Sequence, residues 1–117
     1  FRTIMNQNGH NDVQLWATEF GWATWDGFGS AAPEPWMTYN TRWDQANYII
    51  RAFEIGQQRP DIGVMFLWNL NFATTRLIER RDERAAYGIV PYTTAIRPAF
   101  WMIWDAVRPG EVRDSYE

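Results

Sequence analysis

One carboxylate stands near the end of a short apolar run, where Glu19 follows the residues VQLWAT at 13–18. Glutamate has a poor strand propensity, and burying its charge is costly, so its place in this run needs a reason. A carboxylate at the tip of a strand is held rigidly by the sheet, as a catalytic nucleophile must be. The structural alternative is a charge at a strand end that a neighbouring arginine satisfies.

Aromatic residues make up 17 % of the chain, and many of them lie where loops are expected. Trp22 and Trp25 follow the carboxylate, and Trp68 lies in a second apolar run, IGVMFLWNL at 62–70. An indole ring can stack on the apolar face of a pyranose, so each Trp is a candidate sugar-binding residue, with packing as the alternative. Asn71 is a candidate for hydrogen-bonding a substrate or for capping the end of the second run.

Other chemistries have weaker support in this sequence. His10 is the only histidine and lies in a polar segment, which argues against a Ser-His-Asp triad. The chain has no cysteine, no His/Cys cluster, and only GFGS at 27–30 as a glycine-rich stretch. Net charge is −3, and no apolar run approaches the ~18–20 residues of a membrane span. We therefore expect no metal or other cofactor, no nucleic-acid partner and no membrane span.

Hydrophobic spacing predicts helices and strands in alternation. The predicted elements are helices at 1–8, 42–57 and 98–107 and strands at 13–20 and 62–70. The connections that follow the strands, 21–40 and 71–94, are long. The connections that precede them, 10–12 and 59–61, are short, which is typical of a (β/α)8 barrel whose functional loops follow its strands.

This alternation predicts an α/β fold with parallel strands. Two parallel strands are too few for a stable sheet that is covered on both faces, so we expect a larger sheet. Residues 1–110 are predicted to be the C-terminal portion of a (β/α)8 TIM barrel, and 111–117 a polar tail. The missing strands would then lie upstream or in another chain.

A period of two along each strand predicts which side chains share a face. In the first strand, Leu15, Ala17 and Glu19 are assigned to the barrel interior. Their neighbours Trp16, Thr18 and Phe20 are assigned to the side of the helices. In the second strand, the interior side would hold Val64, Phe66 and Trp68.

Several segments resemble clan A glycoside hydrolases, the retaining (β/α)8-barrel enzymes that include many cellulases, mannanases, galactanases and xylosidases. TEFGW at 18–22 is similar to their seventh strand, and GVMFLWNLN at 63–71 is similar to their eighth. YGIV at 87–90 and RPAFW at 97–101 resemble the approach to their eighth helix. The resemblance covers roughly 1–108 and implies strands 7 and 8 with helices 7 and 8, preceded by the end of helix 6.

The resemblance implies that Glu19 is the catalytic nucleophile and that Trp68 is a platform beside the sugar. Retaining hydrolysis needs a second carboxyl group about 5–5.5 Å away as acid/base. In this clan that group belongs to an Asn-Glu pair, and the sequence has no such pair. Asp26 and the charge run ERRDER at 79–84 are poor substitutes, because nothing orients Asp26 and a charge run is usually a solvated face.

We therefore expect an O-glycosyl hydrolase for a β-linked poly- or oligosaccharide, in which this chain supplies the nucleophile strand. The 117 residues alone are expected to be inactive. The alternative is a non-catalytic carbohydrate-binding, assembly or scaffold subunit, and a small self-contained α/β domain of unrelated function is a third possibility. The resemblance also implies an extracellular or cell-surface location.

Overall fold

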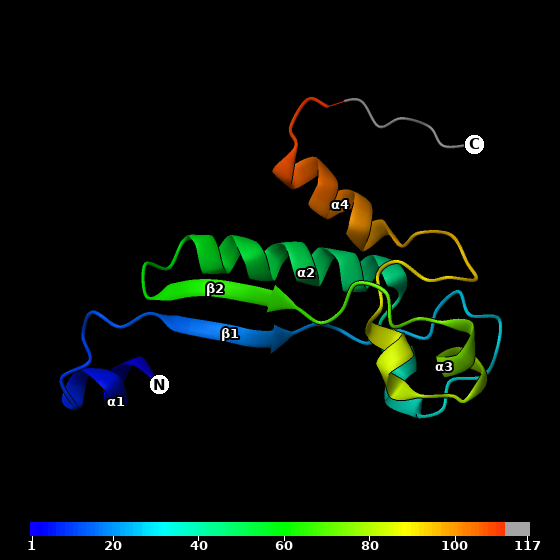
Figure 1. Ribbon diagram of the computed structural model, residues 1–117, viewed down its shortest axis with the longest axis horizontal. Helices are drawn as coiled ribbons and strands as arrows, with labels where there is room; N and C mark the ends of the chain where they lie inside the picture. Colours follow the sequence, from blue (N-terminus) through cyan, green and yellow to red (C-terminus); the bar gives the residue numbers. More distant parts are fainter. Residues whose placement is uncertain (112–117) are drawn as a thin grey trace.

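The computed structural model describes residues 1–111 (Figure 1). Its elements follow the order α1(Arg2–Gln7), β1(Leu15–Phe20), η1(Pro35–Thr38), α2(Arg42–Gln57), β2(Ile62–Leu67), α3(Thr75–Glu79), η2(Glu83–Tyr87) and α4(Pro98–Val107), where η denotes a 3-10 helix. Within this part of the chain no helix is long and apolar enough to cross a membrane. The predicted polar tail at 111–117 lies outside the described residues except for Glu111.

The predicted helices and strands are confirmed as elements, although both strands are shorter than expected. The longest helix, α2, begins with a capping box in which the backbone amide of Asp44 donates to Thr41 Oγ1. The amide of Thr41 donates in return to the carboxylate of Asp44. These reciprocal bonds satisfy amides that the first turn of a helix otherwise leaves unpaired.

The two strands pair in parallel, and α2 connects them and lies against the sheet (Figure 1). The rings of Phe20 and Phe53 meet edge to face at 5.0 Å, which joins the end of β1 to α2. Both strands point toward the half of the molecule that carries α3, whereas α1 lies at the opposite end (Figure 1). The loops that follow the strands are therefore gathered on one side.

The prediction of a barrel portion is wrong. The described residues form four α-helices and one sheet of two parallel strands, and that architecture is a small α/β domain. Strand and helix do alternate, but a single βαβ unit needs the same alternation, because parallel strands require a crossover connection. The step from two strands to eight rested on the expected cover of both sheet faces, and the structure leaves one face of β1 and β2 partly open.

The predicted facing of β1 is also corrected. Trp16 is 60 % exposed and packs against Phe66 at a ring distance of 6.5 Å, while Leu15 and Ala17 are half-buried on the side of α2. The pairing register shifts between Ala17 and Phe20, which brings Phe20 onto the α2 side as well. A strict period of two fails here because an irregularity in the ladder turns the strand.

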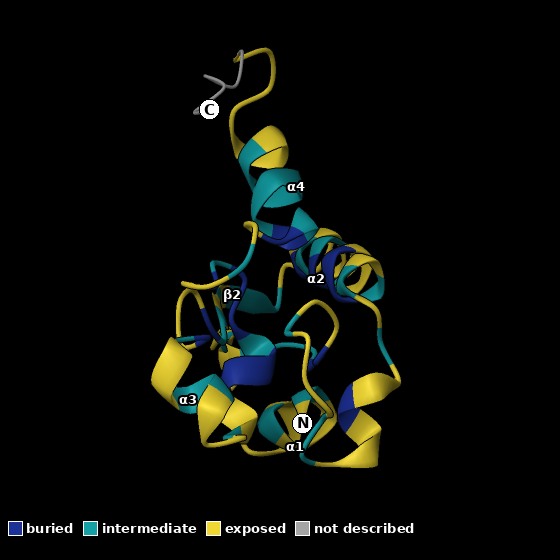
Figure 2. Cartoon of the chain, turned by 90° about the vertical axis from the view of Figure 1, so that its right-hand side faces the viewer, coloured by how far each residue is buried: buried dark blue, intermediate teal, exposed yellow. Residues whose placement is uncertain are grey.

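Buried residues gather at the end of the molecule where α2, α4 and the loops meet (Figure 2). One core cluster joins the loop after β1 to η1 and η2, and it contains Ala23, Trp25, Met37, Ala85 and Ala86. A second cluster joins α2 to α4 and contains Ala46, Ile49, Ile89 and Ala99. Helix α1 has no buried residue, so the core supports the loop end of the sheet rather than the α1 end.

Candidate functional site

A pocket of about 370 Å³ lies at the ends of the two strands. Three parts of the chain line it: the end of β1, the residue that follows β2, and the 3-10 helix η2. The lining residues are Glu19, Phe20, Gly21, Trp68, Glu83, Arg84 and Tyr87. Ligands of parallel α/β sheets bind beside the carboxyl ends of the strands, which is where this pocket lies. The structure therefore brings Glu19 and Trp68, two of the predicted site residues, into one pocket.

The ends of the two strands meet closely beside Glu19. The amide of Trp68 donates a 2.8 Å hydrogen bond to the carbonyl of Phe20. The next residue is Gly21, and a Cβ atom at its position would collide with the carbonyl oxygen of Trp68. The absence of a side chain at Gly21 thus permits the backbone approach that sets Trp68 beside the carboxylate.

Trp68 is half-buried, and its ring packs edge-on against Phe72 at 5.0 Å. The following peptide bond, Trp68–Asn69, is cis. Asn69 is buried, and its side-chain oxygen accepts a 2.9 Å bond from the amide of Phe72 while its amide group donates to the carbonyl of Arg84. Asn69 therefore fixes the loop after β2 to η2 and holds two walls of the pocket together.

Tyr87 lines the pocket on the side of η2. Its carbonyl accepts a bond from the amide of Asn69, and its ring lies next to Gly21. Burial raises the pKa of the Tyr87 phenol, and the nearby Glu83 carboxylate raises it further, since both disfavour the phenolate. The phenol is therefore protonated at neutral pH and can donate a hydrogen bond.

The charged groups of the pocket are not equivalent. The Arg84 guanidinium binds Asp82 through two hydrogen bonds, from Nε at 2.9 Å and from Nη2 at 2.7 Å. This pair lowers the pKa of Asp82 to about 2 and raises that of Arg84. By contrast, within residues 1–111 no side chain donates a hydrogen bond to the carboxylates of Glu19 or Glu83, so both are available to a ligand.

Arg97 and Gln45 form a buried polar centre next to the loop after β1 and η2, which both contribute to the pocket. Arg97 is 2 % exposed and donates to the carbonyls of Thr24 and Ala86, both at 3.0 Å, and to Gln45 Oε1 at 3.2 Å. Gln45 in turn donates to the carbonyls of Trp22 and Ala86. Burial lowers the pKa of Arg97 to about 10, so it is charged at neutral pH. These bonds tie the loop after β1 to η2.

Trp22 and Trp25 lie outside the lining of the pocket. Trp22 is half-buried and packs edge-on against Phe20 at 6.2 Å and against Tyr48 of α2. Trp25 is 4 % exposed, and its indole N–H donates to Ser30 Oγ at 3.2 Å. Both rings are placed as expected for side chains that pack against the protein. We therefore assign neither ring to the proposed sugar site.

Asn71 is exposed and also lies outside the pocket lining. The capping role considered for it is performed by Asn69, two residues earlier. The difference follows from the length of the strand, because β2 ends at Leu67 and not at 70. A predicted strand that ended at Leu67 would have pointed to Asn69 as the capping residue.

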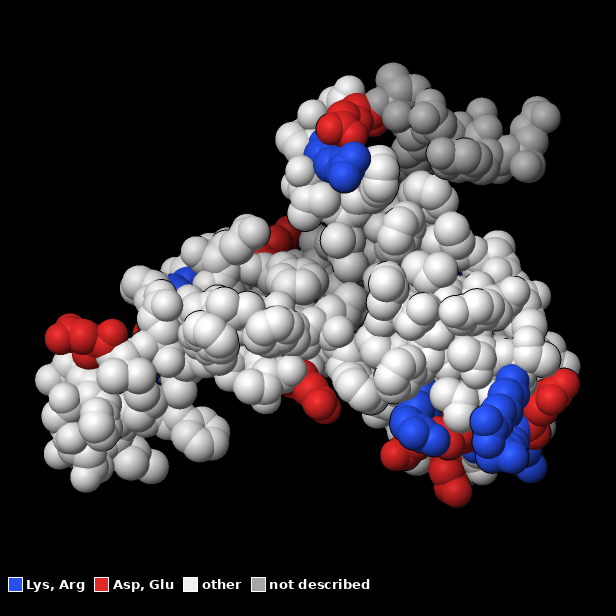
Figure 3. Space-filling model, in the orientation of Figure 1, with Lys and Arg blue, Asp and Glu red and all other residues white. Residues whose placement is uncertain are grey.

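Glu83, Arg84 and Tyr87 were missed as site residues. The charge run at 79–84 is largely exposed, as expected of a solvated face, and Figure 3 shows its charges gathered at the α3 end of the molecule. Two of its members nevertheless line the pocket. The available signal was topological, because loops that follow parallel strands meet at one edge of the sheet.

Asp26 and metal chemistry find no support in the geometry. Asp26 accepts a bond from the amide of Arg42 and pairs with its guanidinium at 3.4 Å, and it lies outside the lining of the pocket. Among the described residues, no group of three His, Cys, Asp or Glu side chains could hold a metal ion.

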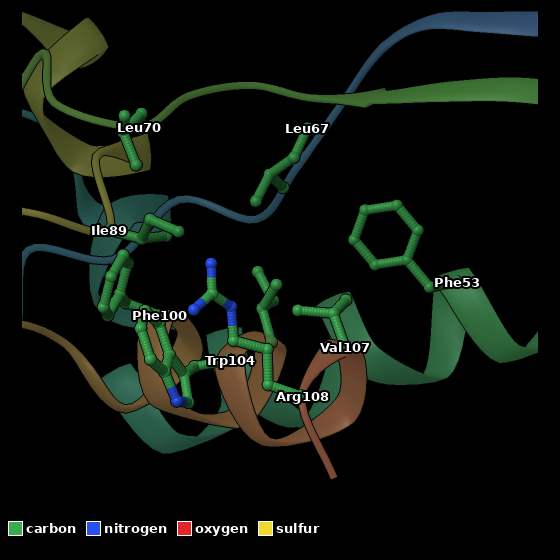
Figure 4. A pocket seen from close by; sticks show the side chains of 9 residues that line it. Phe53, Leu67, Leu70, Ile89, Phe100, Trp104, Val107 and Arg108 are labelled. Atoms are coloured by element: carbon green, nitrogen blue, oxygen red, sulfur yellow. The ribbon is translucent and has the colours of Figure 1, made fainter. Parts of the chain in front are cut away.

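A larger groove of about 430 Å³ lies between α2, α4 and the end of β2. Figure 4 shows Phe53, Leu67 and Trp104 around it, with Arg108 directly after the end of α4. Its lining is apolar apart from this arginine and holds no carboxylate. It cannot supply acid–base chemistry, whereas the Glu19 pocket holds carboxylates beside an indole and a phenol.

The Glu19 pocket combines an available carboxylate, an indole, a neutral phenol and a second carboxylate. Such groups can bind a polyhydroxylated ring and attack an electrophilic carbon on it. Comparison of this chain with protein-family models, with curated proteins and with solved structures found no match.

Proposed function

We propose that this chain carries the nucleophile of a retaining O-glycosyl hydrolase that acts on a β-linked poly- or oligosaccharide. In this proposal Glu19 attacks the anomeric carbon and Trp68 stacks on the sugar ring. The observation that carries it is that these two side chains, from the ends of adjacent strands, line one pocket.

The surroundings of the two residues support the proposal. The Glu19 carboxylate receives no side-chain hydrogen bond within the described residues, so its lone pairs are free for attack. Trp68 offers aromatic surface, and the Tyr87 phenol is a donor for a sugar hydroxyl. The pocket volume of about 370 Å³ lies within the range of roughly 300–1,000 Å³ found for small-ligand sites.

The chemistry would take two steps. Glu19 would displace the leaving oxygen to form a glycosyl ester, and water would then hydrolyse that ester. An ordinary glycoside needs a general acid to protonate its leaving group, and we assign no residue of this chain to that task. The 117 residues alone should therefore not cleave an unactivated glycan, but they should react with a glycoside whose leaving group needs no proton.

The test uses 2,4-dinitrophenyl 2-deoxy-2-fluoro-β-glycosides of glucose, mannose, galactose and xylose. Dinitrophenolate leaves without acid catalysis, and the fluorine slows hydrolysis of the ester, so the glycosylated protein accumulates. Intact-mass spectrometry should detect one added glycosyl group on the wild-type chain and none on Glu19→Gln. Glu34→Gln is the matched control, because Glu34 is exposed and outside the pocket, and it should label like wild type. Equal labelling of wild type and Glu19→Gln would refute the proposed nucleophile.

The second candidate is a non-catalytic carbohydrate-binding or assembly subunit. An exposed aromatic pair away from the pocket, Trp16 with Phe66 on the open face of the sheet, favours an assembly role. For this candidate, glycan binding by Glu19→Gln would equal that of wild type, and neither would form an ester. For either candidate function we propose an extracellular or cell-surface location.

A further inference from the structure

We infer that the Glu19 pocket selects neutral glycosyl units over acidic ones such as uronic acids, and that Glu83 is the residue responsible. The inference rests on the proposed function, because it assumes that the pocket holds a sugar. It concerns the substrate class of that site and the residue that sets it.

The lining of the pocket has more negative than positive side chains. Two carboxylates, Glu19 and Glu83, face one guanidinium, that of Arg84. This guanidinium already donates two hydrogen bonds to Asp82, whose negative charge offsets it. Arg80 lies near enough to lower the pKa of Asp82 but is not part of the lining. The charged side chains of the lining therefore carry a net negative charge.

Glu83 lies on the same wall of the pocket as Tyr87. The two residues stand at the two ends of η2, and both line the pocket. The Glu83 charge also raises the pKa of the Tyr87 phenol. The carboxylate of Glu83 only accepts hydrogen bonds, whereas the neutral phenol can donate one. Sugar hydroxyls both donate and accept, so a neutral sugar can satisfy both groups together.

A uronic acid fits this wall less well. Its carboxylate cannot donate to Glu83, and it adds a third negative charge to the pocket. Like charges at a partly exposed site repel each other, and the repulsion weakens with ionic strength. The nearby Arg84 offsets this repulsion only in part, because its charge is already paired with Asp82 through two hydrogen bonds. We expect an acidic sugar to bind about 10-fold more weakly at low salt.

The test measures binding by isothermal titration calorimetry with two matched pairs of ligands. The pairs are cellotetraose with β-1,4-linked tetraglucuronic acid, and β-1,4-mannotetraose with β-1,4-linked tetramannuronic acid, so the members differ only at C6. The neutral member should bind about 10-fold more tightly at 10 mM salt, and the ratio should fall at 500 mM salt. Glu83→Gln should bring the ratio close to one, whereas Glu34→Gln, which removes the same charge elsewhere, should keep it.

The outcomes separate this inference from the proposed function. Equal or tighter binding of the acidic members to wild type would overturn the selectivity while leaving a sugar site in place. An unchanged ratio in Glu83→Gln, with a wild-type circular dichroism spectrum, would overturn the role of Glu83. If none of the four ligands binds but Glu19 is still labelled by an activated glycoside, the proposed nucleophile stands and the inferred selectivity fails. If neither binding nor labelling occurs, both fail.

Discussion

The amide of Trp68 donates a 2.8 Å hydrogen bond to the carbonyl of Phe20, so the residue after the candidate nucleophile is joined directly to the candidate sugar platform. This bond continues the pairing of β1 with β2 by one residue beyond Leu67. It makes the distance between the two functional side chains a property of the sheet, which is a rigid support, and not of a loop.

Gly21→Ala should disturb this relationship. The new methyl group would meet the carbonyl oxygen of Trp68, so the strand ends must separate. We expect a loss of about 1–3 kcal/mol in the free energy of unfolding, measured by urea titration, and weaker labelling of Glu19. Gly29→Ala is the control, because nothing lies near its Cβ position and only its φ of 70° opposes the change. Labelling at the wild-type rate in Gly21→Ala would show that the close approach does not position the site.

Arg97→Met should destabilise the loop end of the molecule. The substitution removes the side-chain donor that the buried carbonyl of Thr24 and the buried Gln45 Oε1 now have. The carbonyl of Ala86 loses one donor and keeps its bonds from Gln45 and from the amide of Thr24. A buried polar group that loses its partner costs roughly 1–3 kcal/mol, so the urea midpoint should fall clearly. Arg51→Met removes only an exposed ion pair with Glu54 and should change stability by less than about 0.5 kcal/mol. Equal midpoints for the two variants would contradict the role assigned to the buried centre.

Acid should weaken the fold through Asp82 and Asp61. Ion-paired hydrogen bonds, from Arg84 and Arg59 respectively, lower the pKa of each carboxyl from 3.8 to about 2. A carboxyl group with a lowered pKa in the folded state stabilises the fold above its ordinary pKa, and this stabilisation is lost as pH falls through the lowered value. The urea midpoint should therefore fall between pH 4 and pH 2. Asp82→Asn should flatten part of this fall, and Glu34→Gln should leave it unchanged; a steep fall that persists in Asp82→Asn and Asp61→Asn together would contradict the assignment.

Local structure was largely predictable from the sequence, because its signals are local. The spacing of apolar residues identified α2 and α4. Both strands were found from their β-branched and aromatic residues, although each was drawn too long. Glu19 and Trp68 lie at the same edge of the sheet because the two strands are parallel, an arrangement that the sequence also predicted.

What failed depends on contacts between distant segments. The barrel was an extrapolation from two strands, and the facing of Trp16 was lost to a register shift that no side-chain pattern announces. Burial of Trp25 depends on η1 and η2, two short 3-10 helices, of which η2 lies far from it in sequence. Arg97 is nearly fully buried because carbonyls from the loop after β1 and from η2 converge on it and on its partner Gln45.

The most direct test of the central claim is to locate the bond formed with an activated fluoroglycoside. The labelled protein is digested with pepsin at low pH, which preserves the ester, and the peptides are sequenced by tandem mass spectrometry. The account predicts a single glycosyl group on the side chain of Glu19, absent after unfolding in urea before the reaction. A label on any other residue, or no label with any of the four sugars, would contradict it.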